Sequence, residues 1–302
     1  MVHNALRLNG IYPPIPTPFD GDGRVAAGAL TENLQTWNQY ELSGYVVLGS
    51  NGELVLLNEQ ERLQVLETAR AAIPSGKLMI AGTGCQSTVG TIDLTKKAAA
   101  IGADAALVIT PSYYKGRMNT EALVQHFHTV ADTSCIPVIV YNIPAYTGID
   151  LSADTVTALA EHENIIGIKD SSGNVIKMGE IRRLAGSDFQ VLAGSASLLL
   201  PALSVGAAGA ILALANIAPV QCLAIRQHFL DNEWEQACEL QVRMIPVNTA
   251  ITRGWGVPAV KAAMDMLGMY GGPPRAPLLP LLEETKQALF SILIEGKVIE
   301  DN

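Results

Sequence analysis

The chain has 302 residues, 49% hydrophobic and 16% charged, which is enough to bury a large core in one or two domains. Its formal net charge of -9 argues against nucleic acid or an anionic membrane as a partner. Residues 1–10 lack a leader-type apolar segment, no uncharged run is long enough to span a bilayer, and the four cysteines form no CxxC pair, so we expect a cytoplasmic protein with reduced thiols.

Short apolar runs recur along the chain and alternate with longer helical patterns. The first run, GIYPPI at 10–15, is weakened as a strand by its prolines. Seven further runs are almost continuously apolar: GYVVLG (44–49), LMIAG (78–82), ALVIT (106–110), PVIVY (137–141), IIGIK (165–169), QVLAG (190–194) and GAILAL (209–214). This composition is typical of strands in a parallel sheet that is covered on both faces.

The segments between these runs carry helix signals. Asn58 and Glu61 have the spacing of a capping box, and Gly102 is placed to end another helix. Further helices are expected over 119–132, 152–163 and 174–186. Eight βα units of about 20–30 residues each predict a TIM (β/α)8 barrel, with an open doubly wound sheet as the alternative.

Beyond the eighth run the pattern is helical only. Helices are expected over 220–231, 233–251 and 280–296, with no linker or low-complexity segment before them. We therefore divide the chain into a (β/α)8 barrel that carries the active site, 1–218, and the last barrel helix with a C-terminal helical extension, 219–302.

Polar side chains end three of the predicted strands, where the active sites of such barrels lie. Lys169 ends IIGIK, Tyr141 ends the preceding run, and Ser50 and Asn51 follow GYVVLG. An apolar site favours a neutral lysine amine, which attacks a ketone to form a Schiff base. A phenol one strand away can relay protons. The alternatives are a surface salt bridge for the lysine and a structural core position for the tyrosine.

The GSNGE loop suits a keto acid, because its glycines expose backbone amides while Ser50 and Asn51 add donors. An ordinary βα turn would have the same composition. We expect Glu53 to cap the following helix.

Cofactor and metal signatures are weak. GTGCQST resembles a dinucleotide fingerprint, but its third glycine is replaced by Ser87. His126 and His128 are two residues apart and cannot face one ligand from a helix. We expect no cofactor and no metal.

The motifs GSNGE, YNIPAYTG, GIKDSSG, VLAGSA and GAILALAN, in this order, resemble the dihydrodipicolinate synthase/N-acetylneuraminate lyase family. The resemblance implies a (β/α)8 barrel, a homotetramer built as a dimer of dimers, and pyruvate chemistry through a lysine Schiff base. It assigns roles as follows: Lys169 forms the Schiff base, Tyr141 relays protons, Ser50 and Asn51 hold the keto-acid carboxylate, Gly194 and Ile211 line the pyruvate pocket, and Tyr113 or Tyr114 reaches the neighbouring subunit's site.

Three departures concern the second substrate. Tyr146 stands where the synthases have an arginine that pairs with the aldehyde's carboxylate, Asn51 replaces a threonine, and Ser195 often has an acidic counterpart. The combination of GSNGE, TPSYYKGRM, NIPAYTG and YGGPPRAPL resembles instead the 4-hydroxy-2-oxoglutarate aldolase branch of the family, which implies cleavage of a hydroxylated keto diacid to pyruvate and glyoxylate. The alternatives are dihydrodipicolinate synthase, which condenses pyruvate with aspartate semialdehyde, a 2-keto-3-deoxy sugar acid aldolase, and a non-catalytic keto-acid sensor.

Overall fold

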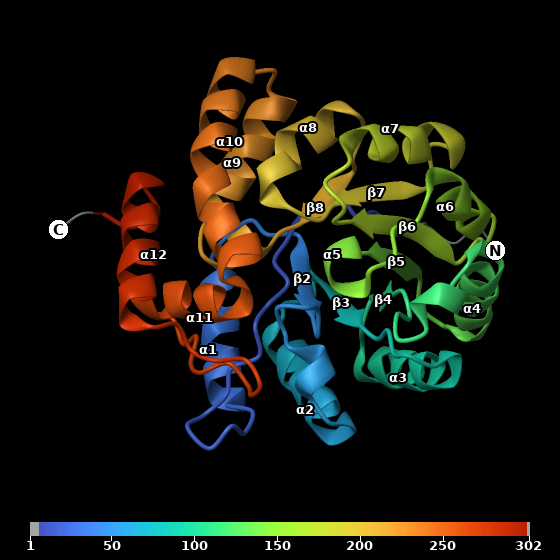
Figure 1. Ribbon diagram of the computed structural model, residues 1–302, viewed down its shortest axis with the longest axis horizontal. Coiled ribbons are helices and arrows are strands. Elements are labelled where there is room, and N and C mark those ends of the chain that lie inside the picture. Colours follow the sequence, from blue (N-terminus) through green and yellow to red (C-terminus); the bar gives the residue numbers. More distant parts are fainter. Residues whose placement is uncertain (1–5, 301–302) are drawn as a thin grey trace.

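Eight parallel strands form one sheet that curls into a barrel (Figure 1). The computed structural model describes residues 6–300, so the first five residues, part of the segment expected to lack a leader, lie outside it. The strands are β1 (Gly10–Tyr12), β2 (Gly44–Val47), β3 (Leu78–Gly82), β4 (Ala105–Ile109), β5 (Val138–Asn142), β6 (Ile165–Asp170), β7 (Gln190–Ala193) and β8 (Gly209–Ile211). All eight predicted strands are present, with ends that differ by a few residues.

The strand order is β1-β8-β7-β6-β5-β4-β3-β2, and the segment after β1 closes the ring against β2. Ile15 N donates to Val46 O at 3.0 Å, and Val46 N donates to Pro13 O at 2.9 Å. The prolines shorten β1 because they supply no N–H, but their carbonyls still accept. This closure confirms the TIM barrel and excludes the open doubly wound sheet.

Helices cover the outside of the barrel (Figure 1). The capping box of Asn58 and Glu61 is formed, and Gly102 ends its helix in the left-handed region at a φ of 103°. The helices are α1 (Ala27–Trp37), α2 (Glu59–Ala72), α3 (Thr88–Ile101), α4 (Thr120–Thr133), the short α5 (Pro144–Thr147), α6 (Ala153–Ala160), α7 (Val175–Leu184), α8 (Leu199–Ser204) and α9 (Pro219–Leu230).

Two layers of apolar side chains pack on either face of the sheet. The larger lies between strands and helices, and the smaller fills the barrel interior with Tyr12, Val46, Ile139, Tyr141 and Ile211 among its members. Since side chains alternate across a strand, each strand needs apolar residues at nearly every position. Tyr141 and Ile211 therefore face the inside of the barrel.

The chain after α9 folds into α10 (Trp234–Thr249), a π-helical turn (Ala250–Gly254), α11 (Gly256–Met266) and α12 (Glu283–Glu295). These helices, orange to red in Figure 1, lie on one side of the barrel beside α1. The sequence did not predict α11. In the residues described, 6–300, no helix has the length and apolar character to cross a membrane. The domain division at 218/219 stays a prediction.

Candidate active site

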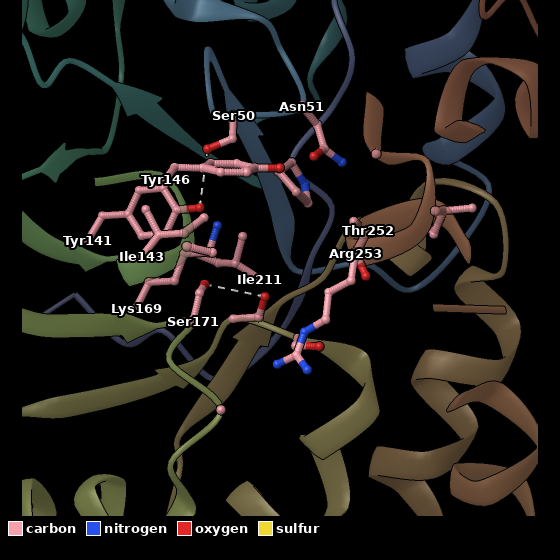
Figure 2. A pocket seen from close by; sticks show the side chains of 18 of the residues that line it. Ser50, Asn51, Tyr141, Ile143, Tyr146, Lys169, Ser171, Ile211, Thr252 and Arg253 are labelled. Atoms are coloured by element: carbon pink, nitrogen blue, oxygen red, sulfur yellow. Dashed lines mark hydrogen bonds between the residues drawn. The ribbon is translucent and has the colours of Figure 1, made fainter. Parts of the chain in front are cut away.

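Lys169 and Tyr141 lie side by side at the C-terminal ends of β6 and β5. They are paired in the sheet register, and the Lys169 Nζ lies 3.9 Å from the centroid of the Tyr141 ring. Lys169 is only 3% exposed and Tyr141 5%. Both line a cavity of about 320 Å³ at the C-terminal mouth of the barrel (Figure 2). The two residues predicted from the strand ends thus share one pocket.

Ser50 joins this pair from the loop after β2. Its Oγ and the Tyr141 hydroxyl share a hydrogen bond of 3.3 Å, and Figure 2 shows the two oxygens facing each other. The neighbouring Asn51 also lines the cavity, and its buried Nδ2 has no hydrogen-bond partner among residues 6–300. Because a buried donor without a partner is costly, this amide is suited to a ligand oxygen.

Glu53, at the end of the same loop, stands at the N-terminus of a short 3-10 turn, Leu54–Leu56, but its side chain makes no capping hydrogen bond there, so the expected cap is not formed. The residue is 2% exposed, and its backbone lies in the left-handed region at a φ of 56°. Its carboxylate pairs with Lys261 Nζ at 2.6 Å and accepts from Arg275 N at 2.8 Å. Two distant segments of the C-terminal extension therefore hold this loop.

Gly194 follows β7 directly and Ile211 ends β8, and both line the cavity. A Cβ on Gly194 would lie 2.0 Å from Ser171 Oγ and 2.7 Å from Asp170 O, so no other residue fits without movement of the backbone. Ser195 also lines the cavity, and its Oγ accepts a hydrogen bond from Asn248 of α10 at 3.1 Å.

The other three tyrosines named in the sequence prediction are placed differently. Tyr146, on α5, lines the cavity and is 64% exposed. Tyr113 and Tyr114 do not line it. They are 79% and 72% exposed and stack edge to face, with ring centroids 5.0 Å apart. Tyr113 therefore does not contribute to the pocket of its own chain.

The cavity also has a wall that sequence reasoning missed. The π-helical turn between α10 and α11 contributes Ile251, Thr252 and Arg253, followed by Gly256 and Val257. Pro246 inside α10 and the glycines around Trp255 were the available signals, because they interrupt a regular helix. The extension is therefore part of the pocket.

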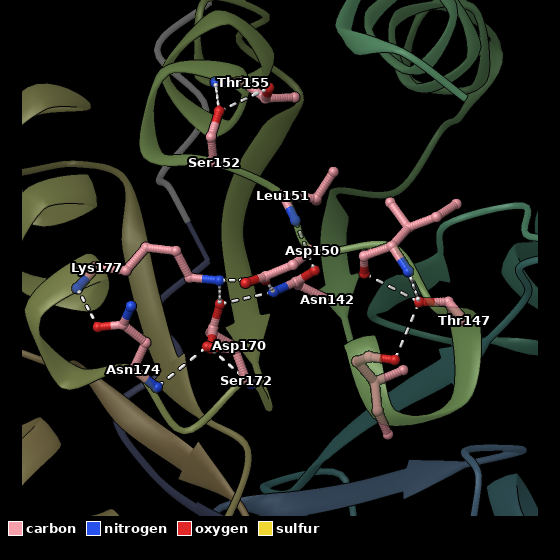
Figure 3. A network of polar contacts seen from close by, with 12 residues as sticks. Asn142, Thr147, Asp150, Leu151, Ser152, Thr155, Asp170, Ser172, Asn174 and Lys177 are labelled. Carbon is pink, nitrogen blue, oxygen red and sulfur yellow. Dashed lines mark hydrogen bonds and ion pairs between the residues drawn. The ribbon is translucent and has the colours of Figure 1, made fainter. Parts of the chain in front are cut away.

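Asp170, the residue after Lys169, points to the other face of β6 and holds the end of this strand in place. One carboxylate oxygen accepts from Asn142 Nδ2 at 2.9 Å and pairs with Lys177 Nζ at 3.0 Å, while the other accepts from Ser172 N at 2.9 Å (Figure 3). The carboxylate is fully buried, so its ion pair and hydrogen bonds offset the loss of hydration. The network fixes the backbone from which Lys169 projects.

No group of three histidine, cysteine, aspartate or glutamate side chains that could bind a metal occurs among residues 6–300. The charged and polar lining is instead made of Lys169, Arg253, two tyrosines, hydroxyls and one amide. These groups suit an organic anion with a carbonyl that the amine can reach.

The sequence profile of the Dihydrodipicolinate synthetase family matches residues 7–295. A 4-hydroxy-tetrahydrodipicolinate synthase of Methanothrix thermoacetophila is 39% identical over 95% of this chain and 96% of its own. An Emericella nidulans protein named "Probable 4-hydroxy-2-oxoglutarate aldolase, mitochondrial" is 37% identical over 98% and 97%. A prophage protein of the dihydrodipicolinic acid synthase family from E. coli K12, solved in complex with pyruvate, superposes with a TM-score of 0.91 at 29% identity, over 97% and 99% of the two chains. The chain belongs to the dihydrodipicolinate synthetase family and is an enzyme of that family of lyases.

Proposed function

We propose that this protein is a pyruvate-dependent class I aldolase that cleaves a 4-hydroxy-2-oxo acid, such as 4-hydroxy-2-oxoglutarate, reversibly to pyruvate and an aldehyde, here glyoxylate. The observation that carries the proposal is the register pair of Lys169 and Tyr141, with the tyrosine hydroxyl bonded to Ser50. An amine, a phenol and a hydroxyl in one pocket supply a nucleophile and a proton path.

In this mechanism the Lys169 amine attacks the 2-keto carbon, and loss of water from the carbinolamine leaves an iminium. Tyr141, assisted by Ser50, accepts the proton of the 4-hydroxyl as the C3–C4 bond breaks. The bonding electrons move into the iminium to give an enamine, and the aldehyde leaves. Protonation at C3 and hydrolysis then release pyruvate and the free lysine. Asn51 Nδ2, which lacks a partner among the described residues, is assigned to the carboxylate beside the ketone.

Borohydride trapping tests the covalent step. The protein is incubated with pyruvate and sodium borohydride, and its peptides are analysed by mass spectrometry. We expect reduction to fix pyruvate on the peptide that contains Lys169, and Lys169→Met as the matched control to remain unmodified. An unmodified Lys169 peptide in the wild-type protein would refute the mechanism.

The alternative is a 4-hydroxy-tetrahydrodipicolinate synthase, the name carried by the Methanothrix thermoacetophila relative. Tyr146 at the cavity mouth replaces the arginine that pairs with the aldehyde's carboxylate in the synthases, and a phenol lacks its two parallel donors. Because glyoxylate also carries a carboxylate, this departure speaks against the synthases' way of anchoring the aldehyde and not against an acidic aldehyde. Turnover of 4-hydroxy-2-oxoglutarate, of pyruvate with aspartate semialdehyde, and of a 2-keto-3-deoxy sugar acid distinguishes the candidate functions. Pyruvate binding without turnover of any of them would indicate a keto-acid sensor.

We also propose a homotetramer in which Tyr113 reaches the neighbouring subunit's site. Its high exposure in the single chain supports a role at an interface. Light scattering measures the mass in solution. Tyr113→Phe is expected to lower turnover more than Tyr114→Phe, and the reverse order would assign the role to Tyr114.

A further inference from the structure

Arg253 is the second cation of the cavity, and none of the described residues forms an ion pair with it. It lies in the π-helical turn, and its side chain extends toward the β6 and β7 loops (Figure 2). The part of the chain that the structure describes, residues 6–300, includes no carboxylate within ion-pair distance of its guanidinium and no hydrogen-bond acceptor for it.

The surroundings of Arg253 leave its guanidinium open to the cavity. Its Nη2 lies 3.4 Å from the point that a Cβ on Gly173 would occupy, so the glycine leaves room beside it. The hydroxyl residues Ser195 and Thr252 also line the cavity. Among residues 6–300 no aspartate or glutamate lines the cavity, although the whole chain has a net charge of -9. The pocket is thus positively charged within an acidic protein and favours an anion.

We propose that Arg253 binds a carboxylate on the aldehyde half of the substrate, so that the enzyme selects aldehydes that carry an acid group. This inference rests on the proposed aldolase function. A guanidinium offers two parallel N–H donors to a carboxylate, a geometry that gives both strength and orientation. Such a group would fix the leaving aldehyde while Lys169 holds the keto carbon.

A keto diacid carries one carboxylate on each side of the carbon–carbon bond that breaks. In 4-hydroxy-2-oxoglutarate three carbon–carbon bonds of about 1.5 Å separate C2 from C5, so the far carboxylate lies about 4 Å from the carbon that Lys169 attacks. Asn51 and Arg253 approach the cavity from different elements, above and below the Lys169 amine in Figure 2. One carboxylate can meet the amide of Asn51 while the other meets the guanidinium.

The test compares two substrates that differ only at C5. In 4-hydroxy-2-oxopentanoate a methyl group replaces the far carboxylate of 4-hydroxy-2-oxoglutarate. The variants are Arg253→Gln, which removes the charge, and Arg253→Lys, which keeps the charge but not the paired donors. The matched control is Arg183→Gln on α7, an exposed arginine away from the cavity.

We expect Arg253→Gln to lower kcat/KM for the diacid by about 10- to 100-fold, the loss that corresponds to a hydrogen-bonded charge. The same variant should change kcat/KM for 4-hydroxy-2-oxopentanoate by less than about threefold. Arg253→Lys should fall between Arg253→Gln and the wild type, and Arg183→Gln should match the wild type for both substrates.

Equal losses on the two substrates would show that Arg253 supports the fold of the pocket, and unchanged kcat/KM for the diacid would show that it does not touch the substrate. Either result overturns the inference. Borohydride trapping with pyruvate separates these outcomes from failure of the proposed function. It should label Lys169 in Arg253→Gln as in the wild type, whereas absence of labelling in the wild type rejects the aldolase itself.

Discussion

Substitution of Lys261 by methionine should destabilise the protein strongly. Lys261 and Glu53 form an ion pair in which both side chains are 1% exposed. Burial lowers the pKa of Lys261, and the Glu53 carboxylate acts in the opposite direction. Without the ammonium, Glu53 would keep the Arg275 N–H as its hydrogen-bond donor. Breaking a buried pair from one side costs about 3–5 kcal/mol, a large part of the 5–15 kcal/mol that holds a typical domain folded.

The double variant Glu53→Gln/Lys261→Met tests this reasoning, because it removes both charges. We expect it to lose less than half of the free energy of unfolding that Lys261→Met loses. Urea unfolding of the three proteins, followed by tryptophan fluorescence and by circular dichroism, measures the difference, and coincident curves justify two-state treatment. Glu53 N donates to Ser50 O at 3.1 Å, so Lys261→Met should also raise the pyruvate concentration needed for half-maximal trapping. Equal losses of the free energy of unfolding in Lys261→Met and in the double variant would refute the reasoning that an unpaired Glu53 carboxylate causes the destabilisation.

Three further predictions address other contacts. Tyr141→Phe keeps the ring and removes the hydroxyl, so kcat in the aldolase assay should fall about 100- to 10,000-fold while borohydride still labels Lys169; unchanged kcat would contradict the proton relay. Gly194→Ala places a Cβ 2.7 Å from Asp170 O, so the urea midpoint should drop by the equivalent of about 1–3 kcal/mol, and an unaltered midpoint would contradict the close contact. Burial lowers the pKa of His126 from 6.5 to about 4, so on acidification the unfolded chain takes up a proton before the folded one. The free energy of unfolding should therefore fall by about 2 kcal/mol between pH 7.5 and pH 5 because of this residue. His126→Gln should remove that part of the shift in urea midpoint, and an identical shift in the variant would refute the prediction.

The barrel could be predicted from the sequence because its signals are local. Each strand is buried on both faces and reads as an apolar run. Helix ends carry signals that act within one turn, such as the capping side chain of Asn58 and the left-handed backbone of Gly102. The same logic found Lys169 and Tyr141, since a parallel barrel brings consecutive strand ends together.

The features that could not be predicted from the sequence depend on contacts between residues that are far apart in the chain. Glu53 looked like a helix cap, but its partners Lys261 and Arg275 lie in the last third of the chain. The helix α11 was missed because Pro258 reads as a helix breaker. A proline in the first turn removes an N–H that has no partner inside the helix, so α11 tolerates it. The extension therefore looked separate from the site to which it contributes Arg253.

The cavity is lined partly by the strand ends and partly by the turn after α10. This separation matters for engineering the enzyme and for its evolutionary divergence. The groups proposed to break the carbon–carbon bond sit on β5, β6 and the loop after β2, whereas Thr252 and Arg253 belong to a different structural unit. Random libraries confined to 251–257 would alter the aldehyde side of the cavity and leave the Lys169–Tyr141 pair untouched. After gene duplication, substitutions in this segment could change which aldehyde the enzyme accepts. Each intermediate variant would keep the residues proposed to break the carbon–carbon bond.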